Sequence, residues 1–142
     1  MKYLILLMFI FQTGNSQNVE GYWKTIDEDG IAKSIVKVYE TQDGQIEGKV
    51  YRIMKDSERD ILCTKCKGEM KNKPVEGLVI MRDLEPDGDH FEDGEITDPE
   101  NGKTYDCKIW LDDNNQDILH VRGYVSFFYK TQDWERVEEG KF

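Results

Sequence analysis

Short segments rich in β-branched and aromatic residues alternate with turn signals along most of the chain. The turn signals are dipeptides that accept positive φ: Asp29-Gly30, Asp43-Gly44, Asp87-Gly88, Asp93-Gly94 and Asn101-Gly102. The segments between them predict strands near residues 20–26, 32–40, 45–53, 77–83, 90–97, 103–111, 117–123 and 131–138. Eight short strands at this spacing predict an all-β fold, either an eight-stranded antiparallel up-and-down barrel or a sandwich.

Alternation within the predicted strands indicates which side chains face the interior. The inward set is Tyr105, Cys107, Ile109 and Leu111 in one strand and Leu119, Val121 and Gly123 in the next. The outward set is Trp110, His120 and Arg122. The segment 32–40 leaves two interpretations open, because Val36 and Val38 compete with Ile35 and Tyr39 for the inner face.

The N-terminus is typical of a secretory signal peptide. After Met1-Lys2, residues 3–11 form an unbroken apolar run that is too short to span a bilayer, and residues 12–16 are small or polar. We expect cleavage after Ser16, which leaves a single β-barrel domain over residues 17–142. The protein is therefore predicted to be exported, to the periplasm or the extracellular space.

Charge excludes some partners. The formal net charge is −10, and loss of Lys2 with the signal peptide makes the mature chain one unit more acidic. Such a chain repels nucleic acid and anionic lipid head groups. No later apolar run is long enough to serve as a transmembrane segment.

The first and last predicted strands carry a recognisable pattern. Gly21-Tyr22-Trp23 opens the first predicted strand, and Trp134 and Arg136 lie on the last. This arrangement resembles the structural signature of lipocalin-like (calycin) barrels. The resemblance implies that Trp23 closes one end of the barrel and that Arg136 packs across it in a cation–π contact.

Several longer motifs extend the resemblance over about residues 19–137. They are "CTKCKG" at 63–68, "KPVEGLVI" at 73–80, "DPENGKTY" at 98–105, "VRGY" at 121–124 and "TQDWERV" at 131–137. These motifs and their order along the chain resemble those of a bacterial exported family known as domain of unknown function 2147. The resemblance implies an exported single-domain protein with a lipocalin-like β fold. It implies no activity and no catalytic residue.

The pair Cys63 and Cys66 has three chemical interpretations: a metal site, a redox site or a disulfide that stiffens a loop. Structural zinc takes four ligands, and only Cys107, His90 and His120 are left in the sequence to complete a set with this pair. A redox C-x-x-C usually begins a helix. Here a short helix with a capping box at 57–60 is predicted to precede the pair. The cysteines would then follow the C-terminus of that helix, whereas a thiol is activated at a helix N-terminus.

An exported protein meets an oxidising environment, which favours a Cys63–Cys66 disulfide and leaves Cys107 as a buried free thiol. The surrounding segment 54–76 is the longest break in the strand pattern, and it is locally basic, with four lysines in residues 65–73. It is interpreted as a lid over a barrel mouth, a contact for an acidic partner, or a solvated loop, of which the last is favoured.

The segment 124–129, YVSFFY, is the most aromatic part of the chain. Exposed, it would form an apolar patch for a ligand, a partner or a membrane edge. Packed over one barrel end, it would complete the core, which is the favoured interpretation. Arg122 can anchor a carboxylate or pair with Asp98. The candidate ligand-binding set is Tyr105, Ile109, Val121, Arg122, Tyr124, Phe127 and Phe128.

Little in the sequence points to catalysis. Residues 111–117, LDDNNQD, carry oxygen ligands but lack the glycine and glutamate of a calcium loop, so a polar turn is expected. No nucleophile–base arrangement stands out, and we expect no catalytic residue, metal or cofactor. The sequence favours a binding module for a small apolar molecule. The alternative is an envelope interaction protein with a filled barrel, whose loops form the partner surface.

Overall fold

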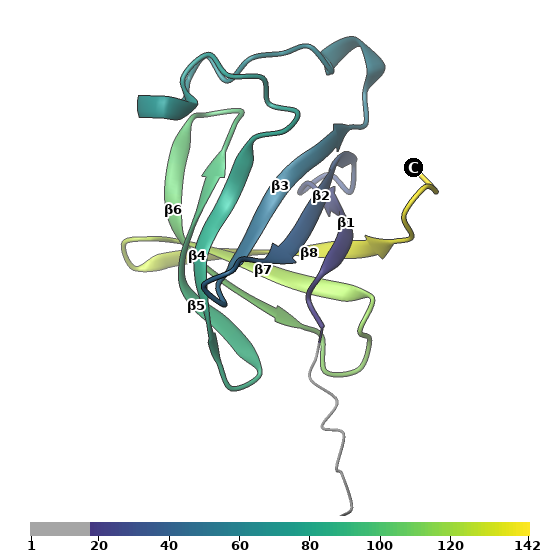
Figure 1. The fold of residues 1–142 in the computed structure, drawn as a ribbon, viewed down its shortest axis with the longest axis vertical. Helices are drawn as coiled ribbons and strands as arrows, with labels where there is room; N and C mark the ends of the chain where they lie inside the picture. Colours follow the sequence, from purple (N-terminus) through teal and green to yellow (C-terminus); the bar gives the residue numbers. More distant parts are fainter. Residues whose placement is uncertain (1–17) are drawn as a thin grey trace, which may run out of the picture.

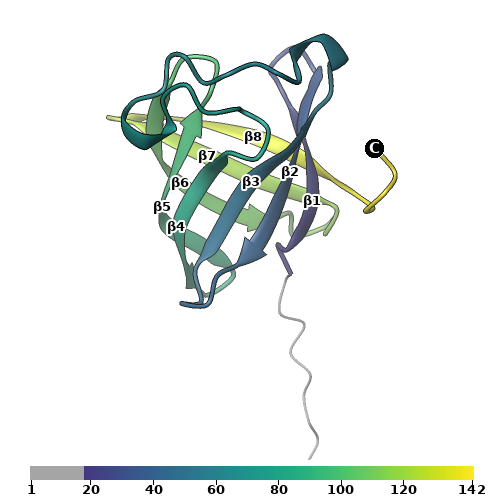
Figure 2. The same cartoon turned by 45° about the horizontal axis from the view of Figure 1, so that its top comes forward.

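The computed structural model describes residues 18–142 and forms a closed antiparallel barrel (Figure 1, Figure 2). Residues 1–17, which contain the predicted signal peptide, lie outside the described residues. The strands are β1 (Gly21–Ile26), β2 (Ala32–Glu40), β3 (Ile46–Ile53), β4 (Val79–Asp87), β5 (His90–Asp98), β6 (Lys103–Leu111), β7 (Ile118–Val125) and β8 (Phe128–Val137). The predicted eight-stranded up-and-down barrel is confirmed.

Each strand pairs with the next, and β8 returns to pair with β1. Asp93-Gly94, which was expected to mark a turn, lies inside β5, where Asp93 has a φ of 62° and the register with β6 shifts. A side chain at position 94 would place its Cβ 2.5 Å from Leu84 Cγ. Gly94 therefore serves a close approach of two strands.

The interior is filled by one buried apolar cluster. The inward facing predicted for β6 and β7 is confirmed, since Cys107, Ile109, Leu111, Leu119 and Val121 belong to this cluster. In β2, the register with β3 shifts between Ile35 and Val36. This bulge explains the ambiguous pattern, because Ile35, Val36 and Val38 are all buried.

The predicted contact between Trp23 and Arg136 is present at the end where the chain enters the barrel. The Arg136 guanidinium lies 4.3 Å from the centre of the Trp23 ring, and the indole N–H donates to the Val19 carbonyl at 2.8 Å. Gly21 has a φ of 137°, and a Cβ there would lie 3.0 Å from Arg136 Nη1. The glycine of the signature is thus required by both backbone and space.

Arg136 also ties three chain segments together through backbone carbonyls. Its Nη1 donates to Glu20 at 3.0 Å, and its Nη2 donates to Asn18 at 2.9 Å and Gln116 at 3.1 Å. A planar guanidinium suits this set of acceptors, whereas a lysine ammonium does not.

Between β3 and β4 the chain crosses the opposite end of the barrel (Figure 1). This connection holds two single 3-10 turns, Asp56–Glu58 and Gly68–Met70. The expected capping box at 57–60 is wrong, because Lys55 precedes the first turn and no side chain caps it. A Cys63–Cys66 disulfide lies between the two turns, and both cysteines are buried.

We predict that Arg136→Lys lowers the free energy of unfolding by about 2–4 kcal/mol, because it keeps the charge but loses the planar set of hydrogen bonds. Urea unfolding followed by far-UV circular dichroism measures the change. Glu135→Gln is the matched control on the neighbouring residue. It breaks the partly exposed Lys24–Glu135 pair at 3.7 Å and is expected to cost less than about 1 kcal/mol. Equal effects of the two substitutions would contradict the role given to Arg136.

Candidate functional site

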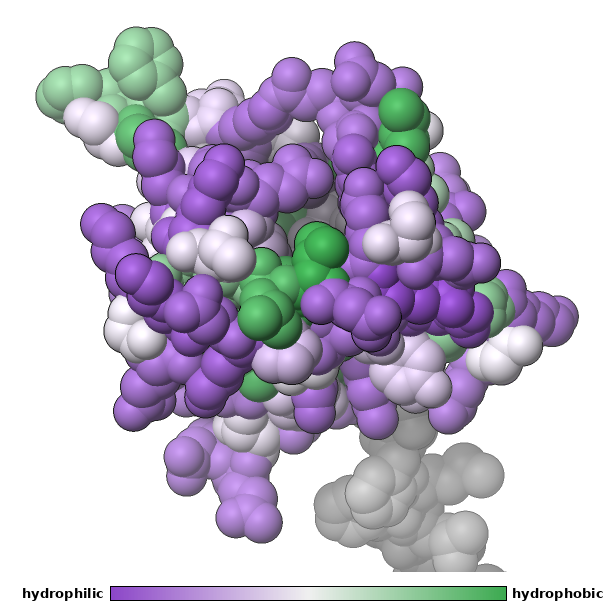
Figure 3. All heavy atoms as spheres, turned by 90° about the horizontal axis from the view of Figure 1, so that it is seen from above, coloured by the Kyte–Doolittle hydropathy of each residue, from purple (hydrophilic) through white to green (hydrophobic). Residues whose placement is uncertain are grey.

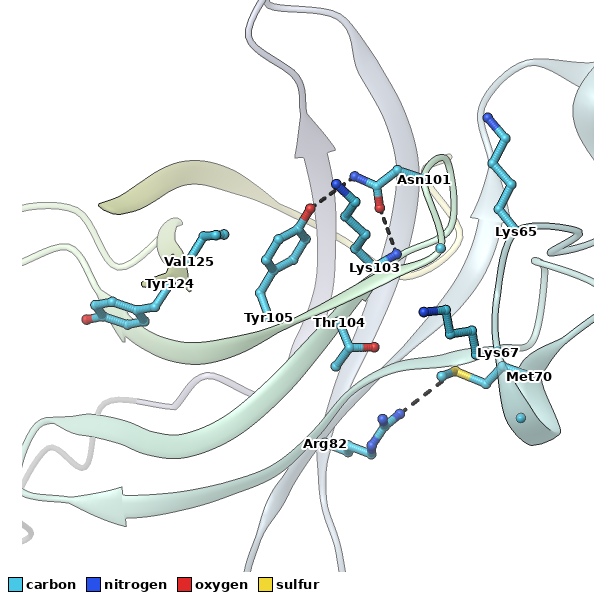
Figure 4. A pocket seen from close by; sticks show the side chains of 12 residues that line it. Lys65, Lys67, Met70, Arg82, Asn101, Lys103, Thr104, Tyr105, Tyr124 and Val125 are labelled. Atoms are coloured by element: carbon cyan, nitrogen blue, oxygen red, sulfur yellow. Dashed lines mark hydrogen bonds between the residues drawn. The ribbon is translucent and has the colours of Figure 1, made fainter. Parts of the chain in front are cut away.

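A pocket of about 760 Å³ opens at the rim of the barrel beneath the long loop. Figure 4 shows its walls: residues of the loop, the β5–β6 turn, the start of β6, the end of β7 and Arg82 of β4. The lining thus comes from four separate stretches of the sequence, 65–70, 82, 101–105 and 124–125, so the pocket exists only in the folded barrel. The lining residues are Lys65, Lys67, Gly68, Met70, Arg82, Asn101, Gly102, Lys103, Thr104, Tyr105, Tyr124 and Val125.

The lining carries four cations and no acid, in a chain whose net charge is −10. Arg82 is neutralised by Glu95, with 3.1 Å between Nη2 and the carboxylate. Within residues 18–142, no salt bridge forms at Lys65, Lys67 or Lys103. Three uncompensated ammonium groups around one concavity make a positive potential that an anion would relieve.

Neutral polar groups lie beside these cations. The Asn101 amide donates to the Tyr105 hydroxyl at 3.1 Å, and its carbonyl oxygen accepts the Lys103 backbone N–H at 2.8 Å. In Figure 4 the Tyr105 ring stands in the wall of the pocket between Tyr124 and the lysines. The Thr104 hydroxyl is engaged with Thr97 at 2.7 Å. The pocket thus combines positive charge with one fixed aromatic face.

The disulfide and a glycine position the lysines. Gly102 has a φ of 73°, and a Cβ there would collide with the Lys65 carbonyl group. The β5–β6 turn therefore packs directly on the backbone between Cys63 and Cys66. This contact brings Lys65 and Lys103 to the same pocket although 38 positions separate them in the sequence.

The residues proposed from the sequence as ligand contacts fall in different places. Tyr105 and Tyr124 line the pocket. Ile109 and Val121 are buried in the core below it. Phe127 and Phe128 lie on the β7–β8 hairpin, which projects from the barrel (Figure 1). The pocket lysines, Arg82 and Asn101 were absent from the proposed set, since nothing in the sequence joins their segments.

The aromatic segment does not fold over the barrel end, contrary to the favoured interpretation. β7 and β8 continue to Val125 and Phe128, so the turn falls at Ser126 and Phe127. Phe127 is 96 % exposed. In Figure 3 the apolar cluster at the left margin corresponds to this projecting hairpin and is separate from the apolar centre of the face.

Arg122 lies outward, as predicted, but its contacts differ from those proposed. Its Nε donates to Thr131 at 2.9 Å, and its guanidinium lies 4.1 Å from the Tyr129 ring centre and 4.8 Å from that of Trp110. Within residues 18–142, none of these Arg122 contacts is with Asp98. It stiffens the outer face of the hairpin and does not line the pocket.

A second polar cluster lies on the outside of β7 around His120. Its Nδ1 is 2.7 Å from Asp133 and its Nε2 is 2.8 Å from Asp112. Burial lowers the pKa of His120, but the hydrogen bonds and negative charges of the two carboxylates outweigh it and raise that pKa overall. The hydrogen bond from His120 lowers the pKa of Asp112, aided by backbone N–H groups. Alternation in the sequence predicted that His120 faces outward, but it could not identify Asp133 and Asp112 as its hydrogen-bond partners.

Residues 112–117 form the expected polar turn, in which Asp112 accepts the backbone N–H groups of Asn114 and Asn115. Within residues 18–142, no three His, Cys, Asp or Glu side chains group closely enough to hold a metal ion. In the same range, no helix is long and apolar enough to cross a membrane.

Comparison with known proteins agrees with the barrel and its motifs. Residues 21–136 match the family described as "Uncharacterized protein conserved in bacteria (DUF2147)". The chain belongs to this family. A comparison with curated proteins finds no match.

Among solved structures, the chain is similar to protein HP1028 from Helicobacter pylori, which is described as belonging to the lipocalin family. The TM-score is 0.73 at 18 % sequence identity, and the alignment covers 86 % of this chain and 84 % of the other. At this identity the likeness establishes a lipocalin-like fold for the DUF2147 chain and no ligand.

We predict that His120→Gln removes a pH-dependent part of the stability. Because the folded pKa of His120 is raised, its contribution is complete below the unfolded value of about 6.5 and is lost as pH rises through the folded pKa. The lowered pKa of Asp112 sets the acid limit, since its contribution is lost as pH falls below about 4. The stability difference between wild type and variant is therefore expected to be largest near about pH 5–6.

Urea unfolding from pH 4 to 9 measures this difference. His90→Gln is the matched control, because His90 also packs on Trp110 but does not join the Asp112–Asp133 bridge. A stability profile of His120→Gln that runs parallel to the wild type across this pH range would contradict a pH-dependent contribution from the bridge.

We also predict the state of the three cysteines. Burial raises the pKa of Cys107 to about 12, so its thiol should resist iodoacetamide in the folded protein and react once in denaturant. Mass spectrometry should find three reactive thiols only after reduction. Labelling of Cys107 without denaturant would contradict its burial.

Cys63→Ser/Cys66→Ser should lower the free energy of unfolding by about 2 kcal/mol in the chain-entropy account.

Proposed function

We propose that the protein is an exported binding protein that holds a small organic anion with an aromatic or apolar part in the rim pocket. The observation that carries this proposal is the acid-free lining with Lys65, Lys67 and Lys103 in a strongly acidic chain. Carboxylate, sulfonate or phosphate groups are the chemistry that such a lining recognises.

The cation cluster has an energetic cost in the empty protein. Like charges repel one another, and this chain has many more acids than bases from which to supply counter-charges. Yet the acids that pair nearby do not pair with these lysines: Glu95 pairs with Arg82, the fourth cation of the pocket, and Glu100 pairs with Lys33 at 3.9 Å. A cluster that is left uncompensated while acids stand nearby is the kind of local conflict that accompanies a binding site.

The apolar part of the ligand is inferred from the other pocket walls. Tyr105, Tyr124, Met70 and Val125 supply aromatic and aliphatic surface beside the lysines. The barrel interior below is occupied by buried side chains such as Ile109 and Leu84. The ligand is therefore proposed to sit at the mouth, against Tyr105, and to be anionic rather than purely apolar as the sequence suggested.

Two further observations support the proposal. The lipocalin-like fold frequently presents a ligand site at the barrel mouth. The Cys63–Cys66 disulfide fits an oxidising compartment, in agreement with the signal-like N-terminus, so periplasmic or extracellular residence is proposed with it.

A matched pair of fluorescent probes tests the charge requirement. We expect 8-anilinonaphthalene-1-sulfonate to bind saturably with a 1:1 stoichiometry and to weaken as salt rises. N-phenyl-1-naphthylamine, which has the same rings without the sulfonate, should bind at least about tenfold more weakly, because it lacks the charge-assisted contacts.

The variant Lys65→Gln/Lys103→Gln should weaken binding of the sulfonate probe about tenfold or more, since it removes two of the charged donors. Lys71→Gln/Lys73→Gln is the matched control. It changes the net charge equally, and its two residues belong to the same basic stretch without lining the pocket. If both double variants weaken binding alike, only the overall field acts and the pocket is not the site.

A further inference from the structure

The tip of the β7–β8 hairpin is an exposed apolar projection. Val125, Phe127, Phe128 and Tyr129 are 54, 96, 77 and 61 % exposed. Two-residue turns normally hold polar residues or glycine, so a phenylalanine at this position gains nothing from the fold. Clustered large apolar side chains on a surface mark a place where the protein meets another apolar phase.

The hairpin is built to present this tip rather than to let it collapse. The strands stay in register up to the last pair, Val125 opposite Phe128. Arg122 stacks on Tyr129 at 4.1 Å, and Tyr124 packs against Tyr129 with 6.1 Å between ring centres. Lys130 contacts the carboxylate of Glu28 in the β1–β2 turn. The tip is therefore held out from the barrel by contacts at its base (Figure 2).

Cations lie directly beside the tip. Tyr124 and Val125 line the same pocket as Lys65, Lys67 and Lys103, so one side of the hairpin adjoins the cation cluster of an otherwise acidic molecule. At physiological salt the Debye length is about 8 Å, so a surface that touches this face senses the nearby lysines more than the distant acids. The neighbouring acid Glu28 is paired with Lys130, so, within the described residues, the three pocket lysines are the unpaired charges of this side on which the docking proposed below relies.

We propose that this aromatic tip docks the protein on a lipid bilayer that contains anionic lipids, with Phe127 and Phe128 in the interfacial layer and the pocket lysines facing the head groups. Aromatic side chains favour this layer, and adjacent Lys residues add attraction to anionic head groups. A second protein fits less well, because four side chains are far fewer than the 20–30 residues that a standard interface takes from each partner. The proposal does not require a ligand in the pocket.

Sedimentation with sucrose-loaded vesicles tests the proposal on the chain of residues 17–142. We expect binding to vesicles of phosphatidylglycerol and phosphatidylcholine, at least tenfold weaker binding to pure phosphatidylcholine, and release in high salt. Phe127→Ser/Phe128→Ser should reduce binding to the anionic vesicles at least tenfold. Ile61→Ser, which removes an apolar side chain that is 45 % exposed on the long loop, should bind like the wild type.

A second readout places the tip in the bilayer. Phe127→Trp should show a blue-shifted emission change, relative to wild type, when anionic vesicles are added, and lipids brominated on the acyl chain should quench it. Unchanged emission with undiminished sedimentation would overturn the proposal, because another surface would then carry the binding. Absence of any binding to anionic vesicles at low salt would also overturn it.

The experiments can contradict the bilayer proposal without contradicting anion binding in the rim pocket, and the reverse. Phe127→Ser/Phe128→Ser should lose binding to vesicles but should bind the sulfonate probe with the affinity of the wild type, because neither residue lines the pocket. Lys65→Gln/Lys103→Gln should weaken both. A different outcome is that the wild type forms a dimer that Phe127→Ser/Phe128→Ser abolishes and that added vesicles do not dissociate. In that case the tip is a contact between copies of this chain, and the bilayer proposal is wrong.

Discussion

Closure of the barrel between β1 and β8 is the constraint on which the rest of the structure depends. One guanidinium, that of Arg136, stacks on Trp23 and donates to carbonyls that precede β1 and β7. Without this junction the sheet would expose two edges with unpaired backbone groups. With it, all eight strands share one interior, and the buried tryptophan seals the end at which the chain enters.

A sealed and filled barrel moves the chemistry to the opposite rim. The inner faces hold residues such as Leu84, Ile109 and Leu119 at zero exposure, so little there is polar. At the rim, the disulfide and the tight contact of Gly102 with Lys65 fix a long loop against the β5–β6 turn. The lysines are thereby held by covalent and steric constraints that do not depend on a counter-ion.

Local patterns in the sequence were sufficient for the fold, because strand alternation and turn dipeptides act over a few residues. The Trp23–Arg136 pair was accessible through a resemblance, and the Cys63–Cys66 bond through its spacing and the expected compartment. The pocket was not accessible, since the approach of Lys65 to Lys103 is set by register across the whole sheet. The hairpin tip was misjudged for a different reason: apolar character favours burial, whereas here strand length places the turn beyond the core.

The separation of charge and apolarity on this surface follows from the same architecture. β7 and β8 extend past the barrel wall, and their free end emerges beside the loop that the disulfide holds down. A cationic concavity and an aromatic projection therefore become neighbours without any contact between the phenylalanines and the lysines being needed. A barrel whose interior is full thus gains an amphipathic face from two connections, and a change in either connection would alter that face while the core stayed intact.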